Sequence, residues 1–86
     1  MAYAIEIPTR VRKVLLDLPA ADRARVSAAI EGLTVDPRPP GCRAMQGEAR
    51  GTYRVRVGDY RVVYRVDDGR LVVLVIRVGN RREVYR

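Results

Sequence analysis

The 86-residue chain contains no histidine, tryptophan or phenylalanine and only one cysteine, Cys42. Without histidine, the chain has almost no ligands for a zinc or other transition-metal site and no histidine for acid–base catalysis. Cys42 cannot form a disulfide within the chain, and with no histidine to activate it we expect a neutral small side chain rather than a nucleophile. The longest uncharged apolar run, residues 71–76, is far shorter than the roughly 20 residues needed to span a bilayer. We therefore predict no metal, no cofactor and no membrane span.

The first ten residues lack the basic start and the long apolar stretch of a secretory signal, so we expect a cytoplasmic protein. A chain of 86 residues is too short to divide its apolar residues between two cores, so we predict a single domain over residues 1–86. Hydrophobic residues make up 48% of the chain and charged residues 31%, which is apolar enough to fold rather than to remain disordered.

Positive charge is the first feature that points to a partner. The 17 bases and ten acids give a net charge of +7, and every base except Lys13 is an arginine. Residues 1–49 have a net charge of +1, whereas residues 50–86 carry ten bases and four acids, a net charge of +6. Arginine binds phosphate with two parallel hydrogen bonds and stacks on bases. The second half therefore favours a polyanionic partner, and a basic solvated surface is the competing interpretation.

The apolar pattern predicts a strand and two helices in the first half. Residues 3–7 alternate apolar and polar positions, as a short strand does. Thr9 is the expected N-cap of a helix that ends near Pro19, and a second helix is expected over residues 20–35. The inward positions of the two helices are Val11, Val14, Leu15, Leu18, Val26, Ala29, Ile30 and Leu33. Together the helices form a hairpin with its apolar face toward the core.

Period-two alternation in the second half predicts three antiparallel strands. The runs are YRVRV, YRVVYRV and LVVLVIRV, and they are separated by the favourable turn dipeptides Gly58-Asp59 and Asp68-Gly69. The predicted fold class is therefore α+β. An N-terminal strand and a helical hairpin precede a three-stranded antiparallel meander, and the helices pack on one face of a single sheet.

The predicted register places four arginines on one face of the sheet. Side chains alternate between the two faces along a strand, so even-numbered hairpin loops determine which residues share a face. Arg56 is expected opposite Arg61 across the first turn, and Arg61 opposite Ile76 across the second. Arg65 is expected opposite Val72. The arginines that share this face are Arg54, Arg56, Arg61 and Arg65. The other face collects valines and tyrosines together with Leu71, and it is the expected core face.

Arginines that face each other across strands repel, so this group requires a compensating charge or a partner. The nearby acids Asp59, Asp67 and Asp68 lie at the predicted turns rather than along the central strands. Guanidinium groups about 5 Å apart across strands are suited to bind phosphates. An acidic protein that covers the face is the alternative, and both partners could bind in turn.

Several segments of the chain resemble a known family. The runs YRVRVGDYRVVY and GNRREVYR closely resemble the C-terminal half of RelE toxins, in the RelE/ParE superfamily of bacterial toxins that are paired with antitoxins. The segments LPAADRARV and DPRP agree with the layout of the first half. The resemblance therefore covers essentially the whole chain, and it implies a RelE-like fold and a toxin of a type II toxin–antitoxin system.

The resemblance also implies an activity. RelE-like toxins are metal-independent endoribonucleases that cut messenger RNA in the decoding site of the ribosome, which inhibits translation and arrests growth. The implied partners are a cognate acidic antitoxin and messenger RNA on the ribosome, with contacts to 16S ribosomal RNA, and the toxin–antitoxin complex would bind operator DNA through the antitoxin. The alternatives are a ParE-like toxin that inhibits DNA gyrase, and a degenerate toxin that only binds its antitoxin.

Family members grip and cleave RNA with basic residues on the sheet and a tyrosine near the C-terminus. Transferred position by position, the implied catalytic residues are Arg61, Arg81 and Tyr85. The implied RNA-binding residues are Arg54 and Arg56, and Arg65 and Arg82 are further basic candidates. Many relatives have histidine or lysine where this chain has Asn80, which cannot exchange a proton near neutral pH. The general base is therefore open between Tyr85 and Glu83.

Overall fold

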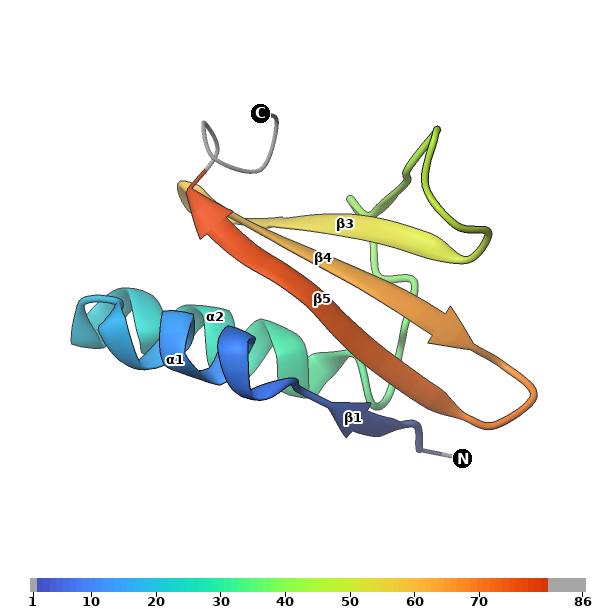
Figure 1. The fold of residues 1–86 in the computed structure, drawn as a ribbon, viewed down its shortest axis with the longest axis horizontal. Coiled ribbons are helices and arrows are strands. Elements are labelled where there is room, and N and C mark those ends of the chain that lie inside the picture. The colour runs from blue at the N-terminus through green and yellow to red at the C-terminus, as the bar shows by residue number, and fades with distance from the viewer. Residues whose placement is uncertain (1, 81–86) are drawn as a thin grey trace.

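The computed structural model of the chain describes residues 2–80. One sheet contains the strands β1 (Ala4–Glu6), β2 (Arg43–Ala44), β3 (Thr52–Val57), β4 (Tyr60–Asp67) and β5 (Val72–Asn80), in the order β1-β5-β4-β3-β2. Helices α1 (Thr9–Asp17) and α2 (Ala20–Gly32) pack on one face of it (Figure 1). β1 runs parallel to β5, and the other neighbours are antiparallel. The predicted α+β class, with both helices on one face of a single sheet, is confirmed.

Proline marks the start of both helices. Pro8 has an extended backbone and occupies the N-cap of α1 without a side-chain hydrogen bond. Thr9 is the first helical residue, so the prediction of Thr9 as the N-cap is wrong. A proline in this place suits a helix start, because it has no N–H of its own to satisfy. Pro19 occupies the N-cap of α2 in the same way. Within residues 2–80, no helix is long and apolar enough to cross a membrane.

The end of α2 differs from the prediction. The helix ends at Gly32 rather than at Val35, which is 81% exposed. The hydroxyl of Thr34 donates a 2.7 Å hydrogen bond to the carbonyl of Glu31. A threonine that satisfies a carbonyl of the last turn competes with continuation of the helix, which explains the early end.

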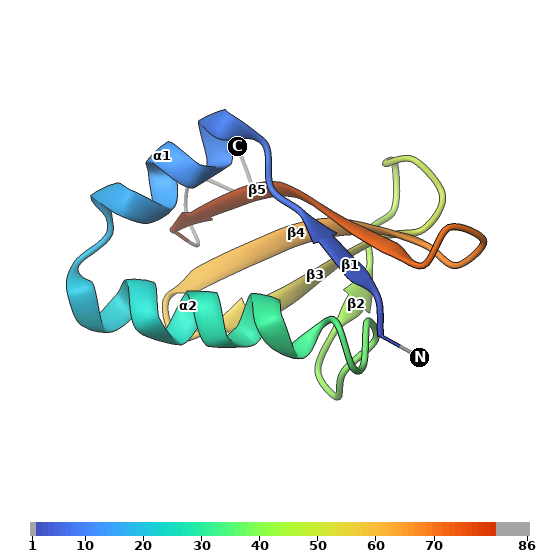
Figure 2. The ribbon, with the colours of Figure 1, turned by 90° about the horizontal axis from the view of Figure 1, so that it is seen from below.

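The core lies between the two helices and the inner face of the sheet. Its buried residues are Val11, Leu15, Val26, Ile30, Leu33, Val62, Tyr64, Val66, Val73, Val75 and Val78. Figure 2 shows α1 and α2 running in opposite directions beside the strands, as a helical hairpin. Two expected members differ. Val14 is 40% exposed, and Leu71 lies in the β4–β5 turn with a φ of 55°, so neither belongs to the buried core.

The first hairpin has the predicted register and the second does not. Arg56 lies opposite Arg61 across the β3–β4 turn, as predicted. In the β4–β5 hairpin, Arg61 lies opposite Gly79 rather than opposite Ile76. The four arginines that were expected to share a face still do so, because the face of each follows from its position in β3 or β4.

A longer turn causes the first part of this shift. Asp67 and Val72 are the last pair before the turn, so four residues connect the strands instead of the predicted two. Arg65 consequently lies opposite Leu74, and the prediction of Val72 as its partner is wrong. A change of two residues in a hairpin loop moves the partners along the strand without exchanging the faces.

A β-bulge in β5 causes the second part. The register shifts between Val63 and Tyr64 of β4, where β5 contains an extra residue, Ile76. A bulge leaves its extra residue unpaired in the ladder, and the guanidinium of Arg10 in α1 donates a 2.8 Å hydrogen bond to the Ile76 carbonyl. The bulge reverses the facing of the residues beyond it. Arg77 therefore points away from the core, to which uninterrupted alternation would assign it.

Candidate functional site

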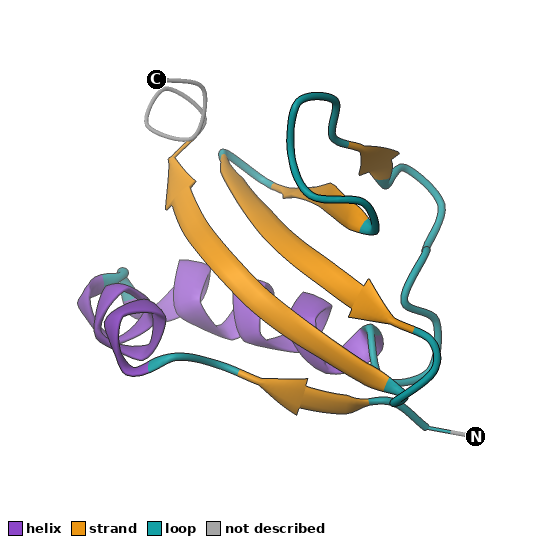
Figure 3. Ribbon diagram, turned by 45° about the vertical axis from the view of Figure 1, so that its right-hand side comes forward, coloured by secondary structure: helices purple, strands orange, loops and turns teal. Residues whose placement is uncertain are grey.

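Within residues 2–80, the face of the sheet that the helices leave open contains six arginines from four strands. Figure 3 views the sheet from this side, with the helices behind it. We call this surface the arginine face. Its arginines are Arg43, Arg54, Arg56, Arg61, Arg65 and Arg77. The structure thus brings together the four arginines that the sequence predicts for this face, and adds two.

The two added arginines come from places where the sequence pattern is weak. Arg43 lies in the two-residue strand β2, directly opposite Arg54. Arg77 lies opposite Val63, because the bulge turns it to this face. Alternation along β5 assigns Arg77 to the core, where an arginine is out of place. Such a conflict indicates a bulge, and it could have revealed the true facing of Arg77 from the sequence.

Arg61 is the most buried arginine of the arginine face, with 8% of its surface exposed. Its Nη1 donates a 3.3 Å hydrogen bond to the carbonyl of Tyr60. Val63, two residues along β4, is fully buried although no helix covers this face. Long arginine stems cover apolar surface in this way, and Arg54 and Arg77 flank Val63 on its two sides. Arg61 is therefore held in a packed surface rather than extended into solvent.

Among residues 2–80, acids are few on this face and lie at its margins. Glu48, in the loop between β2 and β3, forms an ion pair of 2.8 Å with Arg77. Asp67 ends β4 and accepts a 3.0 Å hydrogen bond from the backbone N–H of Arg70. Within residues 2–80, neither Arg56 nor Arg65 has an ion pair with a carboxylate. Arg56 and Arg65 are thus available to an anionic partner.

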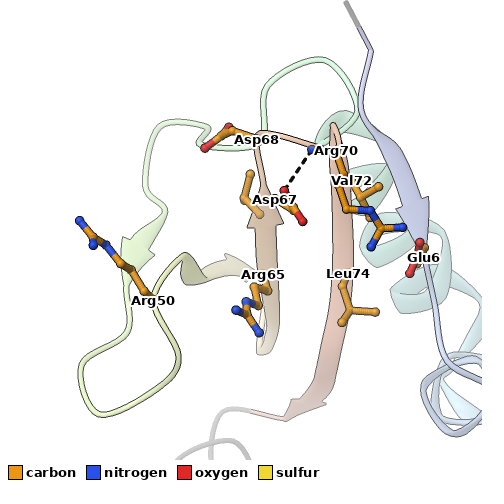
Figure 4. A pocket seen from close by; sticks show the side chains of 9 residues that line it. Glu6, Arg50, Arg65, Asp67, Asp68, Arg70, Val72 and Leu74 are labelled. Carbon is orange, nitrogen blue, oxygen red and sulfur yellow. Dashed lines mark hydrogen bonds between the residues drawn. The ribbon is translucent and has the colours of Figure 1, made fainter.

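A hollow of about 480 Å³ lies at the end of the arginine face where β4 and β5 turn. Its lining residues are Glu6, Arg50, Arg65, Val66, Asp67, Asp68, Arg70, Val72 and Leu74. Figure 4 shows Arg65 beside Leu74, and Glu6 and Arg70 on the far side of β5. Three arginines and three acids line this hollow, so its charges balance. A polyanion is better suited to the opposite end of the face, where Arg56 faces Arg61.

A second group of polar residues lies at the edge where the N-terminal strand meets the β4–β5 turn, and we call it the Arg38 cluster. Arg38 donates hydrogen bonds of 3.2 and 2.8 Å to the two carboxylate oxygens of Asp68 and one of 3.0 Å to the hydroxyl of Tyr53. Tyr3 donates a 2.6 Å hydrogen bond to Asp68. The hydrogen bonds from Arg38 and then from Tyr3 lower the pKa of Asp68 to about 2, and Asp68 in turn raises the pKa of Tyr3. The guanidinium of Arg38 is therefore bound by residues of the fold itself.

The described part of the chain offers no cluster of metal ligands, and its one cysteine is half-buried. Within residues 2–80, no three histidine, cysteine, aspartate or glutamate side chains gather as metal ligands. Cys42 is half-buried near Tyr64. Burial raises the pKa of the Tyr64 hydroxyl, the neighbouring Cys42 adds to this effect, and the hydroxyl donates a 2.8 Å hydrogen bond to the carbonyl of Pro37.

The predicted residues of the C-terminal motif lie outside the described residues. These residues are Arg81, Arg82 and Tyr85, with Glu83 as the alternative base. β5 ends at Asn80, one residue after Gly79, which lies opposite Arg61. The last described pairs of β5 thus lie at the end of the arginine face where Arg56 faces Arg61.

Comparison with known proteins assigns the family. The model of the ParE toxin of the type II toxin–antitoxin system parDE matches residues 6–85. Toxin RelG of Mycobacterium tuberculosis is 34% identical over 87 residues, which cover 100% of this chain and 99% of RelG. The chain belongs to the RelE family of type II toxins. The predicted resemblance to RelE toxins is thereby confirmed.

Solved structures agree with this family. A chain of the archaeal RelE–RelB complex from Pyrococcus horikoshii superposes on this toxin with a TM-score of 0.83 at 30% identity, over 94% of this chain and 97% of that chain. A chain of the toxin–antitoxin complex RelBE2 from M. tuberculosis gives a TM-score of 0.79 at 31% identity, over 93% and 99%. The RelE-like fold of the toxin is therefore confirmed along nearly its whole length.

Proposed function

We propose that this toxin is an endoribonuclease that cuts messenger RNA on the ribosome. The main support is the facing pair of Arg56 and Arg61 at the β3–β4 end of the arginine face. Two like charges opposite each other destabilise a sheet, and Arg56 has no carboxylate partner within residues 2–80. A phosphate between them would remove this repulsion. The arginine face would thus be stabilised by a bound polyanion such as RNA.

The chemistry of the arginine face suits cleavage without a metal. In that reaction the 2′-hydroxyl oxygen of RNA attacks the adjacent phosphorus, the bond to the 5′-oxygen breaks, and a cyclic phosphate and a 5′-hydroxyl result. Negative charge develops on the non-bridging oxygens. Arg61, held in place by its packing, would stabilise this charge with little reorganisation, and Arg81 would assist it. Arg54 and Arg56 would bind flanking phosphates, with Arg65 and Arg82 as further contacts.

Proton transfer needs a group other than arginine, whose pKa exceeds ~12. We propose Tyr85, because the guanidinium groups of this arginine-rich chain would favour ionisation of its phenol, with Glu83 as the weaker candidate. If the ribosome positions the messenger and its attacking hydroxyl, a toxin without a histidine pair can still be effective. Free RNA would then be a poor substrate.

We also propose the partners of this toxin. The related chains of P. horikoshii and M. tuberculosis were solved in complexes named RelE–RelB and RelBE2. A net charge of +7 favours an acidic binding protein. The toxin would act as a single domain in the cytoplasm, and a cognate acidic antitoxin would bind it. The complex would bind operator DNA through the antitoxin. The toxin itself would contact messenger RNA and 16S ribosomal RNA.

Primer-extension mapping in a translating extract tests the nuclease. Purified toxin should produce discrete cuts in messenger RNA that disappear when ribosomes are removed. Rapid cutting of naked RNA would contradict the dependence on the ribosome. The matching family model is named for ParE, so a DNA gyrase supercoiling assay is run in parallel. Inhibition of gyrase without RNA cuts would replace the nuclease by a ParE-like function, and inactivity in both assays would indicate a degenerate toxin.

A further inference from the structure

Glu48 reaches over the arginine face from the loop between β2 and β3, residues 45–51, which we call the Glu48 loop. Its Oε1 lies 2.8 Å from Nη2 of Arg77, and the side chains of Glu48 and Arg77 are 38% and 43% exposed. β4 lies between β3 and β5, so this contact crosses roughly 10 Å of sheet, twice the spacing of neighbouring strands. Figure 3 shows the loop curling in front of β3, with the helices behind the sheet.

Arg77 occupies a position that suits a phosphate ligand. It lies opposite Val63 on one side, and Arg54 lies opposite Val63 on the other. Arg61 follows two residues away on β4 and points to the same face. Neighbouring side chains across a sheet are about 5 Å apart. Arg77 therefore extends the row of guanidinium groups onto β5, within reach of the same anionic strand.

We propose that Arg77 is an RNA-phosphate-binding residue of this toxin, and that the carboxylate of Glu48 competes with RNA for it. The proposal rests on the RNA-binding function proposed above. In the free toxin Glu48 occupies the guanidinium of Arg77. When RNA binds, a phosphate takes the place of the carboxylate and the Glu48 loop lifts away.

The exchange costs Arg77 little, because both ligands offer its guanidinium the same kind of acceptor, an anionic oxygen. An exposed ion pair contributes little to stability, since water solvates both partners well. RNA binds several arginines of the face at once, so its phosphate is held close to Arg77 by the neighbouring contacts. A polyanion bound along the face therefore displaces Glu48 from Arg77, whereas a single free anion does not.

The Glu48 loop is built to move at its tip while its base stays fixed. The backbone N–H of Met45 donates to the carbonyl of Thr52 at 2.9 Å, and the N–H of Val66 donates to the carbonyl of Gly51 at 2.9 Å. Residues 46–50 between these anchors are all exposed. Gly47 and Gly51 have φ values of 79° and 86°, a region open to glycine at little cost. Rotation at these glycines would lift Glu48 at the cost of the 3.2 Å hydrogen bond from the Thr52 N–H to the Ala49 carbonyl, and it would leave the strand pairing of the sheet intact.

Thr52 supplies a second reason why a bound phosphate is favoured. It lies at the base of the Glu48 loop, opposite Arg65, and is only 3% exposed. Within residues 2–80 its Oγ1 has no hydrogen-bond partner. A buried hydroxyl without a partner destabilises the conformation that buries it. A phosphate bound beside Arg65, which lies opposite Thr52, would supply this hydroxyl with a hydrogen-bond partner.

The test compares the cleavage rates of a Glu48 variant and an Arg77 variant, which should change in opposite directions. The probe is a labelled messenger on purified ribosomes, cut at toxin concentrations below saturation. Glu48→Gln should raise the cleavage rate about two- to fivefold, because an exposed competitor is removed. Arg77→Gln should lower the rate and reduce the slope of log rate against log salt concentration by about 1, the loss of one phosphate contact. In the double variant, Glu48→Gln should have no further effect.

Several outcomes would overturn the proposal. If the ion pair only holds the loop in place, both single variants change the rate in the same direction. If Glu48 acts through its charge alone, Glu48→Gln raises the rate equally with and without Arg77. Asp59→Asn, at the β3–β4 turn, measures that general charge effect. Arg56→Gln separates the two proposals: an unchanged rate overturns the RNA-binding function itself, whereas a lost rate with unaffected Glu48 and Arg77 variants overturns only the role of Arg77.

Discussion

The arginine face and the Arg38 cluster use the same residue type for opposite purposes. In the Arg38 cluster, one arginine meets one carboxylate through two hydrogen bonds, a tyrosine hydroxyl accepts a third, and the guanidinium carbon lies 5.2 Å from the ring centre of Tyr53. On the arginine face, Arg56 and Arg61 face each other. The cluster joins the N-terminal strand, the loop after α2 and the β4–β5 turn. The arginine of the cluster thus supports the fold, whereas the facing arginines form a basic surface suited to an anionic ligand.

Replacement of Arg61 should have the largest effect on activity. Loss of one fixed donor to a developing anion typically lowers a rate by about 10²–10³-fold. We expect Arg61→Ala to lose messenger cleavage and growth arrest to this extent, and Arg61→Lys to recover part of it. Arg25→Ala is the matched control, because Arg25 is 66% exposed on α2 and pairs with Asp22. Unaltered toxicity of Arg61→Ala, with the protein still folded, would contradict the nuclease.

Replacement of Arg38 should have the opposite result, a loss of stability with unchanged activity. Arg38→Ala removes the hydrogen bonds to Asp68 and Tyr53, so we expect the Tm to fall by roughly 4–8 °C, the shift of a modest loss of stability in a small domain. Cleavage at a temperature where the variant is folded should equal that of the unchanged toxin. A thermal melt and a cleavage assay on the same preparation check both parts. Lost cleavage in a folded variant would mean that the two regions are not independent.

Replacement of Arg10 tests the link between the helices and the arginine face. Arg10→Ala removes the hydrogen bond to the Ile76 carbonyl at the bulge, which we expect to cost about 0.5–1 kcal/mol of unfolding free energy. Because the bulge sets the direction of Arg77, the variant should also lose part of the RNA contact made by that residue. Chemical denaturation and the salt slope of cleavage measure the two effects. Arg12→Ala, on the same helix, is the control.

The smallest effect is a pH dependence confined to the Arg38 cluster. The pKa of Asp68 lies at about 2 in the folded toxin, below its ordinary value of 3.8. A carboxylate with a lowered pKa stabilises the fold above its ordinary pKa, and this stabilisation is lost as pH falls from about 4 toward about 2. Asp68→Asn should therefore lower the Tm at pH 6 and approach the unchanged toxin near pH 2. Parallel Tm curves for the two proteins over this range would contradict the role of Asp68.

The sequence predicted those parts of the fold that depend on local signals. Alternation and the Gly58-Asp59 turn fixed the pairing of Arg56 with Arg61, because a two-residue turn leaves a single register. The Asp68-Gly69 dipeptide offered an equally strong signal, yet Asp67 pairs with Val72 around a longer turn. The Asp67 carboxylate accepts the N–H of Arg70 within this turn, and such a side-chain contact stabilises a longer turn that alternation does not reveal.

The strand propensity of the residues around Ile76 does not predict the bulge. Isoleucine suits any strand position, and the interaction that supports the extra residue comes from Arg10, 66 residues earlier in the chain. Arg77 was therefore missed although it lies on the arginine face. The roles of Arg81, Arg82 and Tyr85 come from resemblance alone, and these residues lie beyond the described part of the chain.

The uncovered side of the sheet also affects how copies of this toxin meet one another. An open β-sheet with buried valines beneath it would ordinarily stack against a second copy and aggregate. Here two molecules that approached through this side would bring a dozen guanidinium groups together, six from each. They would separate again in dilute buffer, whereas a long nucleic acid or heparin chain would bridge them into a precipitate. Nuclease treatment and high ionic strength should therefore keep the purified toxin in solution.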